Sequence, residues 1–569
     1  MIATELNGAY PAVQALAEGG VAGRVHAKDA ALYAFDAAAQ ECCEHFMGWA
    51  DLSSKPPVPL TDIQAFADEC RERGFDAVML IAQGGSSAAA AAISACSTQV
   101  GGMRFFALDS DSPVCLREAF GQIDLARTLV IASSKSGGTI EMRSLLAAVR
   151  AIYAQQAPDE DFSQHMAAIT DPGSALERMA RDEGWLAVFP GEPTVGGRFS
   201  ALSVFGLVPA ALMGVDLQSF VAHALEAEQS CSQDAASNPA IGLAAFLYDN
   251  YLAGRDKVAL VTSEHGRAFA QWIVQLVAES VGKDGKGILP YIEYDPALLA
   301  RDTGDRSAVA FMIGVDRQDG QGAFEADLDA IDVAIPRLNW SIDDTDALAE
   351  QFVMWEYAVA MCGYLMQVCP FDQPDVAQAK ANVLTILGDG LPAPDFAQGD
   401  WMLEGAYRGQ AEVRLAPCFC ECGCVDEALR ALMSSVKPGD YFCVNAFLPY
   451  TGEERFEALR RIRRTVGERL GVASCLEIGP RYLHSSGQLY KGGPNTGVFL
   501  VLSADEAQDM PIEGEAASSL GALAKAQAIG DALTLADRGR RVVHLHLPDN
   551  EPVTLNALAD LVTEIAGGA

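Results

Sequence analysis

The sequence predicts an α/β protein with two doubly wound parallel sheets in succession and an α/β extension at its C-terminus. Three segments carry this prediction, and each consists of a short apolar run, a turn of small residues and a run of helix formers. They read FDAVMLIAQGGSSAAAAAISAC, ARTLVIASSKSGGTIEMRSLLAAVRAIY and RDKVALVTSEHGRAFAQWIVQLVAES. Short apolar runs that alternate with helical segments are typical of βαβ units, whose strands pair in parallel.

The order of these segments divides the 569 residues into four expected parts. Residues 1–59 are expected to form a peripheral helical arm. Residues 60–215 contain the first two segments, which are close enough to share one sheet. The third segment opens a second sheet within residues 216–400. Residues 401–569 alternate strand-like runs, such as DYFCVNAFLPY and TGVFLVLSAD, with helical ones. A chain of this length has room for three or four domain-sized units.

The charge balance and the cysteine content indicate the compartment and the partners. The chain has 40 Lys and Arg against 76 Asp and Glu, a formal net charge of −36, which repels nucleic acid and anionic membranes. No signal peptide is visible, so the fourteen cysteines are expected to be reduced. The uncharged run at 199–215 contains Pro209 and is short for a membrane span, which favours a buried helix. We therefore expect a cytoplasmic protein.

Two further segments each leave two interpretations open. CFCECGC places cysteines at alternate positions, namely Cys418, Cys420, Cys422 and Cys424. On a strand such residues lie about 6.5 Å apart and form a packed stripe. Thiolates that share a zinc ion lie within about 4 Å, which only a tight turn at Gly423 would allow. The basic helix EERFEALRRIRRTVGERL indicates either an anion site or, as we expect, a solvated face.

The turn between the second strand and its helix has the composition of a phosphate site. Backbone N–H groups at a helix start attract an anion, and glycines let it approach closely. The expected donors are hydroxyls, glycine backbone and one ammonium group, at Ser134, Lys135, Ser136, Gly137, Gly138 and Thr139. Gly84, Gly85 and Ser86 are expected to form the facing edge of the pocket. The alternative is that each turn only caps its own helix.

Two charged residues outside the loop are candidates for acid–base and electrostatic catalysis, which need a titratable group and a fixed charge in a partly desolvated site. Glu279 ends a helix with an apolar face, where partial desolvation raises the pKa of a carboxylate. Its alternative role is a salt bridge to Lys283. Arg198 lies at the start of a long uncharged run and has to find an anion, either catalytic or structural.

Two more candidates lie further along the chain. Pro374 fits the first turn of a helix, which places Gln373 and Lys380 on one face, within reach of a common ligand. The alternative is a solvated lysine. His484 is one of eight histidines, and its ordinary pKa suits acid and base catalysis, although a lone histidine is more often structural.

These residues resemble a known family. The loop at 133–139 resembles the phosphate loop of the sugar isomerase domain. TVGGRFSALSVFG, QLVAESVGKDGKG, PFDQPDVAQAK and RYLHSSGQL resemble signature stretches of the glucose-6-phosphate isomerase family. The tail with HSSGQLYKGGPNTGVF looks most like the isomerase half of bifunctional transaldolase/isomerase proteins. No transaldolase-sized region precedes it, so a stand-alone isomerase is expected.

The resemblance implies two sugar isomerase domains and reversible conversion of D-glucose 6-phosphate to D-fructose 6-phosphate through a cis-enediolate, without metal or cofactor. In that family pattern Glu279 transfers the proton and Arg198 steadies the enediolate. Gln373 contacts the substrate, Lys380 lies beside the ring oxygen and His484 opens the ring. A homodimer is also implied, with the histidine segment crossing to the neighbour's site. One departure is the order, because His484 follows Lys380 in this chain.

Three alternatives to this function remain. A regulator that binds a sugar phosphate without converting it would need the loop but neither Glu279 nor Arg198. A metal-dependent aldose isomerase would need converging His and acid ligands, which the sequence does not suggest apart from the cysteine cluster. A broader enzyme would also accept mannose 6-phosphate, since one hydroxyl's stereochemistry is read by pocket shape.

Overall fold

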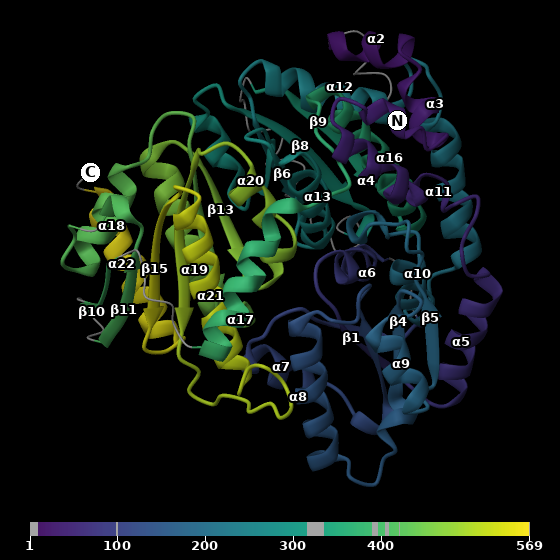
Figure 1. Cartoon of the computed structure of the whole chain (residues 1–569), viewed down its shortest axis with the longest axis horizontal. Coiled ribbons are helices and arrows are strands. Elements are labelled where there is room, and N and C mark those ends of the chain that lie inside the picture. The colour runs from purple at the N-terminus through teal and green to yellow at the C-terminus, as the bar shows by residue number, and fades with distance from the viewer. Residues whose placement is uncertain are drawn as a thin grey trace.

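The computed structural model describes residues 10–97, 101–315, 335–389, 397–403, 409–419 and 421–567. Three β-sheets follow one another along the chain, each lined by helices (Figure 1). Two are parallel, and the C-terminal sheet is mixed. The predicted fold class is therefore confirmed. Within the described residues, no helix combines the length and the apolar character needed to cross a lipid bilayer.

The first sheet has the strand order β2-β1-β3-β4-β5, and all neighbouring strands are parallel. Its strands are β1 (Ala77–Ile81), β2 (Arg104–Leu108), β3 (Thr128–Ser133), β4 (Met166–Thr170) and β5 (Ala187–Pro190). The order reverses between β1 and β3. Such a switch point leaves a crevice at the carboxyl ends of the strands, where ligands of α/β sheets bind. The two Gly/Ser turns that follow β1 and β3 lie at this crevice.

Helices cover both faces of the first sheet. Alternate residues of β1 enter two different cores, Val78 and Leu80 on one side and Met79 and Ile81 on the other. This explains the uniformly apolar strand, because a parallel sheet buried on both faces has no polar side. The surrounding helices are α5 (Leu60–Glu72), α6 (Gly85–Cys96), α7 (Pro113–Phe120), α8 (Ile140–Gln156), α9 (Ala175–Asp182) and α10 (Val204–Leu212). The segment 199–215 thus contains a buried helix, as expected.

The second sheet has the order β7-β6-β8-β9 and is also parallel. Its strands are β6 (Lys257–Thr262), β7 (Leu289–Ile292), β8 (Arg306–Ile313) and β9 (Arg337–Ile342). Its helices are α11 (Leu217–Cys231), α12 (Pro239–Leu252), α13 (Arg267–Val281) and α16 (Thr345–Met366). Helix α13 packs against α6, which joins the second sheet to the first.

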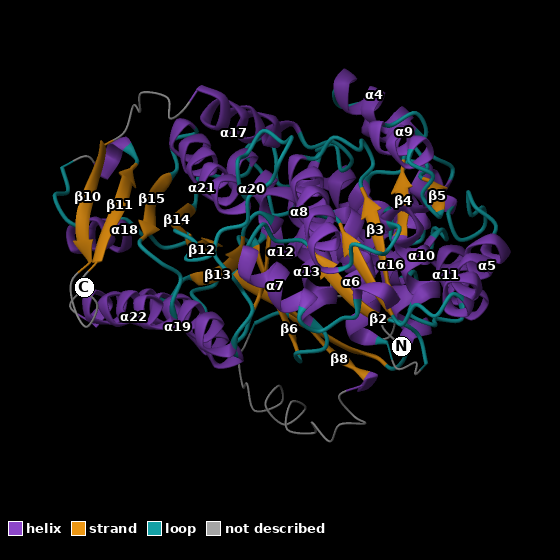
Figure 2. Ribbon diagram, turned by 90° about the horizontal axis from the view of Figure 1, so that it is seen from below, coloured by secondary structure: helices purple, strands orange, loops and turns teal. Residues whose placement is uncertain are grey.

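The C-terminal sheet has the order β10-β11-β15-β14-β12-β13. Strands β12 (Tyr441–Phe447), β13 (Ala473–Ile478), β14 (Gly497–Ala504) and β15 (Arg541–Leu547) pair in parallel, whereas β10 (Ala397–Leu403) and β11 (Gly409–Leu415) are antiparallel. Its helices are α18 (Val425–Ser434), α19 (Glu453–Leu470), α20 (Gly487–Gly492), α21 (Leu520–Asp537) and α22 (Pro552–Gly567). Helix α17 (Ala377–Asp389) packs along α21, although the two helices are distant in the sequence (Figures 1 and 2).

The N-terminal helices α2 (Pro11–Glu18) and α3 (Val21–His26) lie at the edge of the molecule (Figure 1), and the segment that follows α4 (Ala37–Phe46) enters the core. The turn after α4 buries Trp49. Trp49 stacks on Phe199 with ring centroids 4.9 Å apart. The arm therefore supports the residue next to Arg198, because its aromatic side chains complete the core there.

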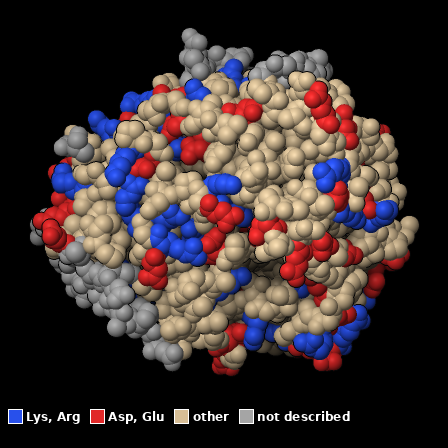
Figure 3. Space-filling model, turned by 45° about the horizontal axis from the view of Figure 1, so that its top comes forward, with Lys and Arg blue, Asp and Glu red and all other residues tan. Residues whose placement is uncertain are grey.

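The basic helix α19 is only partly solvated along its arginine-rich face, which corrects the expectation of a solvated face. Arg463 is fully buried and pairs with Glu293 and Asp295, which follow β7 of the second sheet. Arg460 and Arg464 also contact Asp295, at 3.8 and 3.6 Å. The helix is therefore a charged interface between the second and the C-terminal sheet. Figure 3 shows one face of the molecule, on which basic side chains lie among acidic ones in small groups.

Candidate active site

A cavity of about 240 Å³ lies beyond the carboxyl end of β3 in the first sheet. The phosphate loop lines one side of it through Ser136, Gly138 and Thr139. Lys380 of α17 and His484 of the 3₁₀ turn η9 (Arg481–His484) line another. Residues far apart in the sequence thus meet at one cavity, because the C-terminal helices pack against the first sheet.

The phosphate loop is organised by its own hydroxyl groups. The Gly137 N–H donates to Ser134 Oγ at 3.2 Å, and Ser134 Oγ lies 3.0 Å from Thr139 Oγ1. The Gly138 N–H donates to Ser136 Oγ at 3.3 Å. Gly137 has φ +67°, a left-handed conformation that favours glycine. The loop is a preformed turn at the start of α8, as an anion site requires.

Lys135 pairs with an aspartate of the same sheet. Its ammonium group lies 2.9 Å from Asp171 and donates to the Glu192 carbonyl at 3.2 Å. The side chain therefore points to the loops after β4 and β5, and it does not line the cavity. Contact of Lys135 with a phosphate stays a prediction.

The Gly84–Gly85 turn forms a close-packed floor beside the loop. Gly84 has φ +58°, and a Cβ added there would lie 2.9 Å from Cβ and O of His484. A Cβ at Gly85 would lie 2.2 Å from the Gly197 backbone. These contacts explain the glycines, because any side chain would separate the turn from the histidine and arginine segments. Contact of Gly85 and Ser86 with a phosphate stays a prediction.

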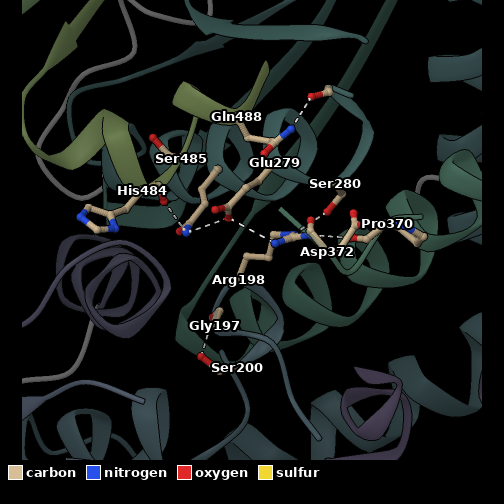
Figure 4. A network of polar contacts seen from close by, with 12 residues as sticks. Gly197, Arg198, Ser200, Glu279, Ser280, Pro370, Asp372, His484, Ser485 and Gln488 are labelled. Atoms are coloured by element: carbon tan, nitrogen blue, oxygen red, sulfur yellow. Dashed lines mark hydrogen bonds and ion pairs between the residues drawn. The ribbon is translucent and has the colours of Figure 1, made fainter. Parts of the chain in front are cut away.

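Glu279 is buried, with 3% of its surface exposed, near the end of α13. Its Oε2 lies 3.5 Å from Arg198 Nη1 and accepts a hydrogen bond of 3.2 Å from Gln275 Nε2 (Figure 4). Burial raises the pKa of Glu279, and the positive charge of Arg198 and the Gln275 hydrogen bond offset only part of this effect. The alternative salt bridge to Lys283 does not form, because Lys283 pairs with Asp372 at 2.6 Å.

Arg198 lies in the 3₁₀ turn η5 (Gly197–Phe199) and is 4% exposed. It donates to Ser280 Oγ at 2.8 Å and to the Pro370 and Asp372 carbonyls at 2.6 and 2.9 Å. These bonds fix the guanidinium while Nη1 faces Glu279 (Figure 4). The arrangement combines both alternatives raised by the sequence, since Arg198 is held structurally and still presents charge to the carboxylate.

His484 is joined to both halves of the site. Its carbonyl accepts a hydrogen bond of 2.8 Å from Gln275 Nε2, the same amide that binds Glu279. Its ring points away from the Glu279 carboxylate (Figure 4). Ring atom Nε2 lies 3.1 Å from Glu141 Oε1. Within this chain His484 thus contacts Gly84, Gln275 and Glu141, and the expected crossing of the histidine segment to a neighbouring subunit stays a prediction.

Glu141 is a site residue that sequence reasoning did not identify. It lies in the first turn of α8, directly after the phosphate loop, and is 5% exposed. It also accepts a hydrogen bond of 2.7 Å from Gln527 Nε2. Burial acts to raise the pKa of Glu141, but the charge and hydrogen bond of His484, together with Lys380, leave that pKa lowered. The only sequence signal was an acidic residue at a helix start, which is common for other reasons.

Gln373 and Lys380 do not share a continuous α-helix. Gln373 precedes the 3₁₀ turn η7 (Pro374–Val376), and α17 begins at Ala377. Lys380 lines the cavity, whereas Gln373 is exposed and does not. The predicted common face is therefore wrong, because the 3₁₀ turn changes the rotation between the two residues. Contact of either side chain with a substrate stays a prediction.

The cysteine cluster does not form a strand. Cys418 lies in the 3₁₀ turn η8 (Pro417–Phe419), and Cys424 caps the start of α18. The expected packed stripe is therefore wrong, and Cys420 lies outside the described residues. Over the part of the chain that the structure describes, no group of three or more His, Cys, Asp or Glu side chains is arranged to hold a metal ion.

Comparison with known proteins agrees with this geometry. Residues 72–297, which contain the phosphate loop, Arg198 and Glu279, match the family model of phosphoglucose isomerase. A glucose-6-phosphate isomerase from Rippkaea orientalis is 32% identical over 311 residues, which are 46% of this chain and 56% of that protein. One from Nostoc punctiforme is 29% identical over 387 residues, 58% of this chain and 70% of that protein. The match with the Rippkaea protein thus spans little more than half of that relative.

Two solved structures share the fold. A hypothetical protein from Thermus thermophilus has a TM-score of 0.56 at 22% identity, covering 68% of this chain and 99% of its own. A glucose-6-phosphate isomerase from Chlamydia trachomatis has a TM-score of 0.52 at 19% identity, covering 66% and 85%. At these identities the two structures show a shared fold. The family rests on the match of residues 72–297 and on the sequence relatives. The chain belongs, through residues 72–297, to the phosphoglucose isomerase family.

Proposed function

We propose that the protein is a phosphosugar isomerase that interconverts D-glucose 6-phosphate and D-fructose 6-phosphate. The observation that carries the proposal is one amide, Gln275 Nε2, which binds both the Glu279 carboxylate and the backbone of His484. This amide bridges two groups. On one side lies Glu279, a buried base with a raised pKa, and on the other lies His484, whose ring contacts the Glu141 carboxylate. The neighbouring loop suits a phosphate ester.

In this proposal the phosphate rests on the loop at 134–139 and the sugar extends toward Gln275. His484 moves the proton that opens the ring, with Glu141 holding its Nε2. Glu279 then transfers a proton between C2 and C1. Arg198 stabilises the negative charge of the enediolate, because its guanidinium is already oriented and little water is present to screen it. No step in this scheme uses a metal or an organic cofactor.

Glu279 does not line the cavity itself, so the proposal requires that the sugar reach beyond the cavity to its carboxylate. The sugar has to enter the space beside the Gln275 bridge and bring C1 and C2 to the carboxylate. A structure with bound fructose 6-phosphate checks this directly. A carboxylate that points away from both carbons in that structure would remove Glu279 from its role.

The decisive experiment measures fructose 6-phosphate formation from glucose 6-phosphate with the variant Glu279→Gln. We expect nearly all turnover to disappear while sugar phosphate still binds in calorimetry, because the amide keeps the shape but accepts no proton. The matched control is Glu356→Gln, a buried carboxyl on α16 that is 2% exposed and lies outside the proposed site. Retained turnover in Glu279→Gln contradicts the mechanism, and binding without turnover in wild type indicates a regulator.

The same assay carries two further arms. Mannose 6-phosphate as substrate tests a broader specificity, and a chelator tests for a metal requirement. We also propose a homodimer and a cytoplasmic location, which the resemblance and the composition support, and sedimentation of the purified chain checks the first of these.

A further inference from the structure

Asp111 is a fully buried carboxyl group that the proposed chemistry does not use. It lies between the end of β2 and the start of α7, and none of its surface is exposed. Within the described residues, neither of its oxygens makes a hydrogen bond of normal geometry, although the Gln527 side chain lies close enough to lower its pKa. An ionised carboxylate in such a place would be strongly destabilising, because it would be desolvated without a counter-charge or a donor.

The sheet topology places Asp111 and Glu141 at the same end of the first sheet, where the charge of Glu141 acts on Asp111. Strands β2, β1 and β3 are parallel neighbours, so the segments after β2 and β3 lie at the same edge. Asp111 follows the first and Glu141 follows the second. Burial raises the pKa of Asp111 far above its ordinary value, the charge of Glu141 raises it further, and the nearby Gln527 amide offsets only a little.

The buried oxygens around Glu141 outnumber the hydrogen-bond donors that reach them. Glu141 accepts from His484 and from Gln527, and the Gln527 Oε1 atom is buried without a partner. Asp111 contributes two more buried oxygens without donors. A single proton on Asp111 turns this unsatisfied acceptor group into a donor for Glu141 or for Gln527 Oε1. Two neighbouring buried carboxyl groups also favour one shared negative charge over two.

We propose that Asp111 holds a proton and acts as a positioning residue, keeping Glu141 ionised and directed at His484 Nε2. Glu141 then only accepts, so His484 donates from Nε2 and leaves Nδ1 as the atom that exchanges a proton with the sugar. This inference rests on the proposed function for its catalytic meaning, although the protonation of Asp111 does not.

Infrared difference spectroscopy of the full chain tests the protonation without any activity. Wild type minus Asp111→Asn is expected to show the carbonyl stretch of a protonated carboxylic acid. The control is wild type minus Glu356→Gln, since burial raises the pKa of Glu356 well above its ordinary value as well. A difference spectrum with a carboxylate band in place of the acid band for Asp111 would overturn the proposal.

Turnover tests the positioning role. Asp111→Ala is expected to lower kcat by about 10-fold to 100-fold, the usual effect of losing an outer partner of a reactive group. Asp111→Asn should recover most of that loss, because its neutral amide donates as the protonated acid does. If Asp111→Asn is as damaging as Asp111→Ala, the residue is needed as an anion and the proposal is wrong.

The pH profile separates positioning from a merely structural role. Glu141 is faced by Asp111, by His484 of η9, by Lys380 of α17 and by the neutral Gln527 of α21. Loss of the Asp111 donor destabilises ionised Glu141, so the acid limb of kcat should move to higher pH in Asp111→Ala and stay in place in Asp111→Asn and Glu356→Gln. An unmoved limb in Asp111→Ala contradicts the proposal. If wild type does not isomerise the sugar, the proposed function fails, while the infrared result still decides the state of Asp111.

Discussion

Charge pairing separates the buried charged residues of the candidate site from other charged residues of the two parallel sheets. Glu279, Arg198 and Glu141 are 3%, 4% and 5% exposed, and each has at least one partner that another part of the chain supplies. Lys135 and Lys283 look equally suitable in the sequence, yet each is neutralised by an aspartate. The reactive groups are therefore distinguished by incomplete pairing in a dry environment, which residue type alone does not reveal.

The charge of Arg198 should set the acid limit of catalysis. Arg198 lowers the pKa of Glu279 against the larger effect of burial, so Arg198→Met should raise that pKa further. A base has to be deprotonated to act, and the acid limb of kcat/KM should therefore move to higher pH. The loss of the fixed charge should also lower kcat by about 10²-fold to 10³-fold.

The measurement for Arg198→Met is kcat/KM across the acid range. Its control is Arg255→Met. Arg255 precedes the amino end of β6, away from the site, and pairs with Asp302. An unshifted limb would mean that Arg198 does not act on the catalytic base.

Lys135 should contribute to stability more than to substrate affinity. Its pair with Asp171 is about one-fifth exposed, so a double-mutant cycle of Lys135→Met and Asp171→Asn should give a coupling free energy of about 1 kcal/mol in urea unfolding. The KM for sugar phosphate should change little in Lys135→Met. A KM that rises by more than about 10-fold without loss of stability would show that the ammonium binds phosphate after all.

Short elements determine which side chains reach the cavity. The 3₁₀ turn η7 lies between Gln373 and α17 and directs only Lys380 to the cavity. Helix α17 can approach α21 closely because Gly530 has no side chain. A Cβ there would lie 3.1 Å from Val383 Cγ2, and Asn382 donates to Thr534 Oγ1 at 3.0 Å beside it. The position of Lys380 thus depends on one glycine of another helix.

Gly530→Leu should displace α17 and impair catalysis without abolishing the fold. The larger side chain cannot fit between the helices, so Lys380 should move and kcat/KM should fall by about 10-fold or more. Gly388→Ala is the matched control, since nothing lies within 4 Å of a Cβ at this position of α17. That control should stabilise the protein by about 0.5–1 kcal/mol. Equal kinetics of Gly530→Leu and wild type would exclude a role for the contact.

At the scale of the whole molecule, the packing of the three sheets accounts for the changed order of motifs. One core contains Leu80 of the first sheet and Leu260 of the second. A second core joins Val261 to the C-terminal sheet, and a third places Leu523 of α21 against the first sheet. The C-terminal region therefore contacts both parallel sheets. His484 reaches the site although it follows Lys380, because helix packing and not chain order brings the groups together.

Arg463 should be essential to this assembly. Arg463→Met leaves Glu293 buried without its closest counter-charge, which should lower the free energy of unfolding by about 3–5 kcal/mol. Burial raises the pKa of Glu293 and Arg463 opposes this, so the variant should raise it further. A carboxyl group with a raised folded-state pKa binds its proton more tightly when folded, and stability is lost as pH rises toward that pKa.

The loss in Arg463→Met should therefore be larger at about pH 8 than at about pH 5, measured by urea unfolding. The double variant with Glu293→Gln should recover much of it and remove the added pH dependence. A loss that is independent of pH would point to packing in place of charge.

The amino-acid sequence by itself determined the strand–turn–helix units and the composition of the loop at 133–139, because these depend on residues that are neighbours along the chain. Glu279 and Arg198 were chosen through the family resemblance, and their roles stay predictions. The division into four parts stays a prediction. Only the tertiary structure decided that Lys135 pairs with Asp171, that Glu141 contacts the His484 ring, and that α19 packs between the second and the C-terminal sheet. The physical reason is that periodicity and turn chemistry are local, whereas the partner of a charged group is selected by burial among segments distant in sequence.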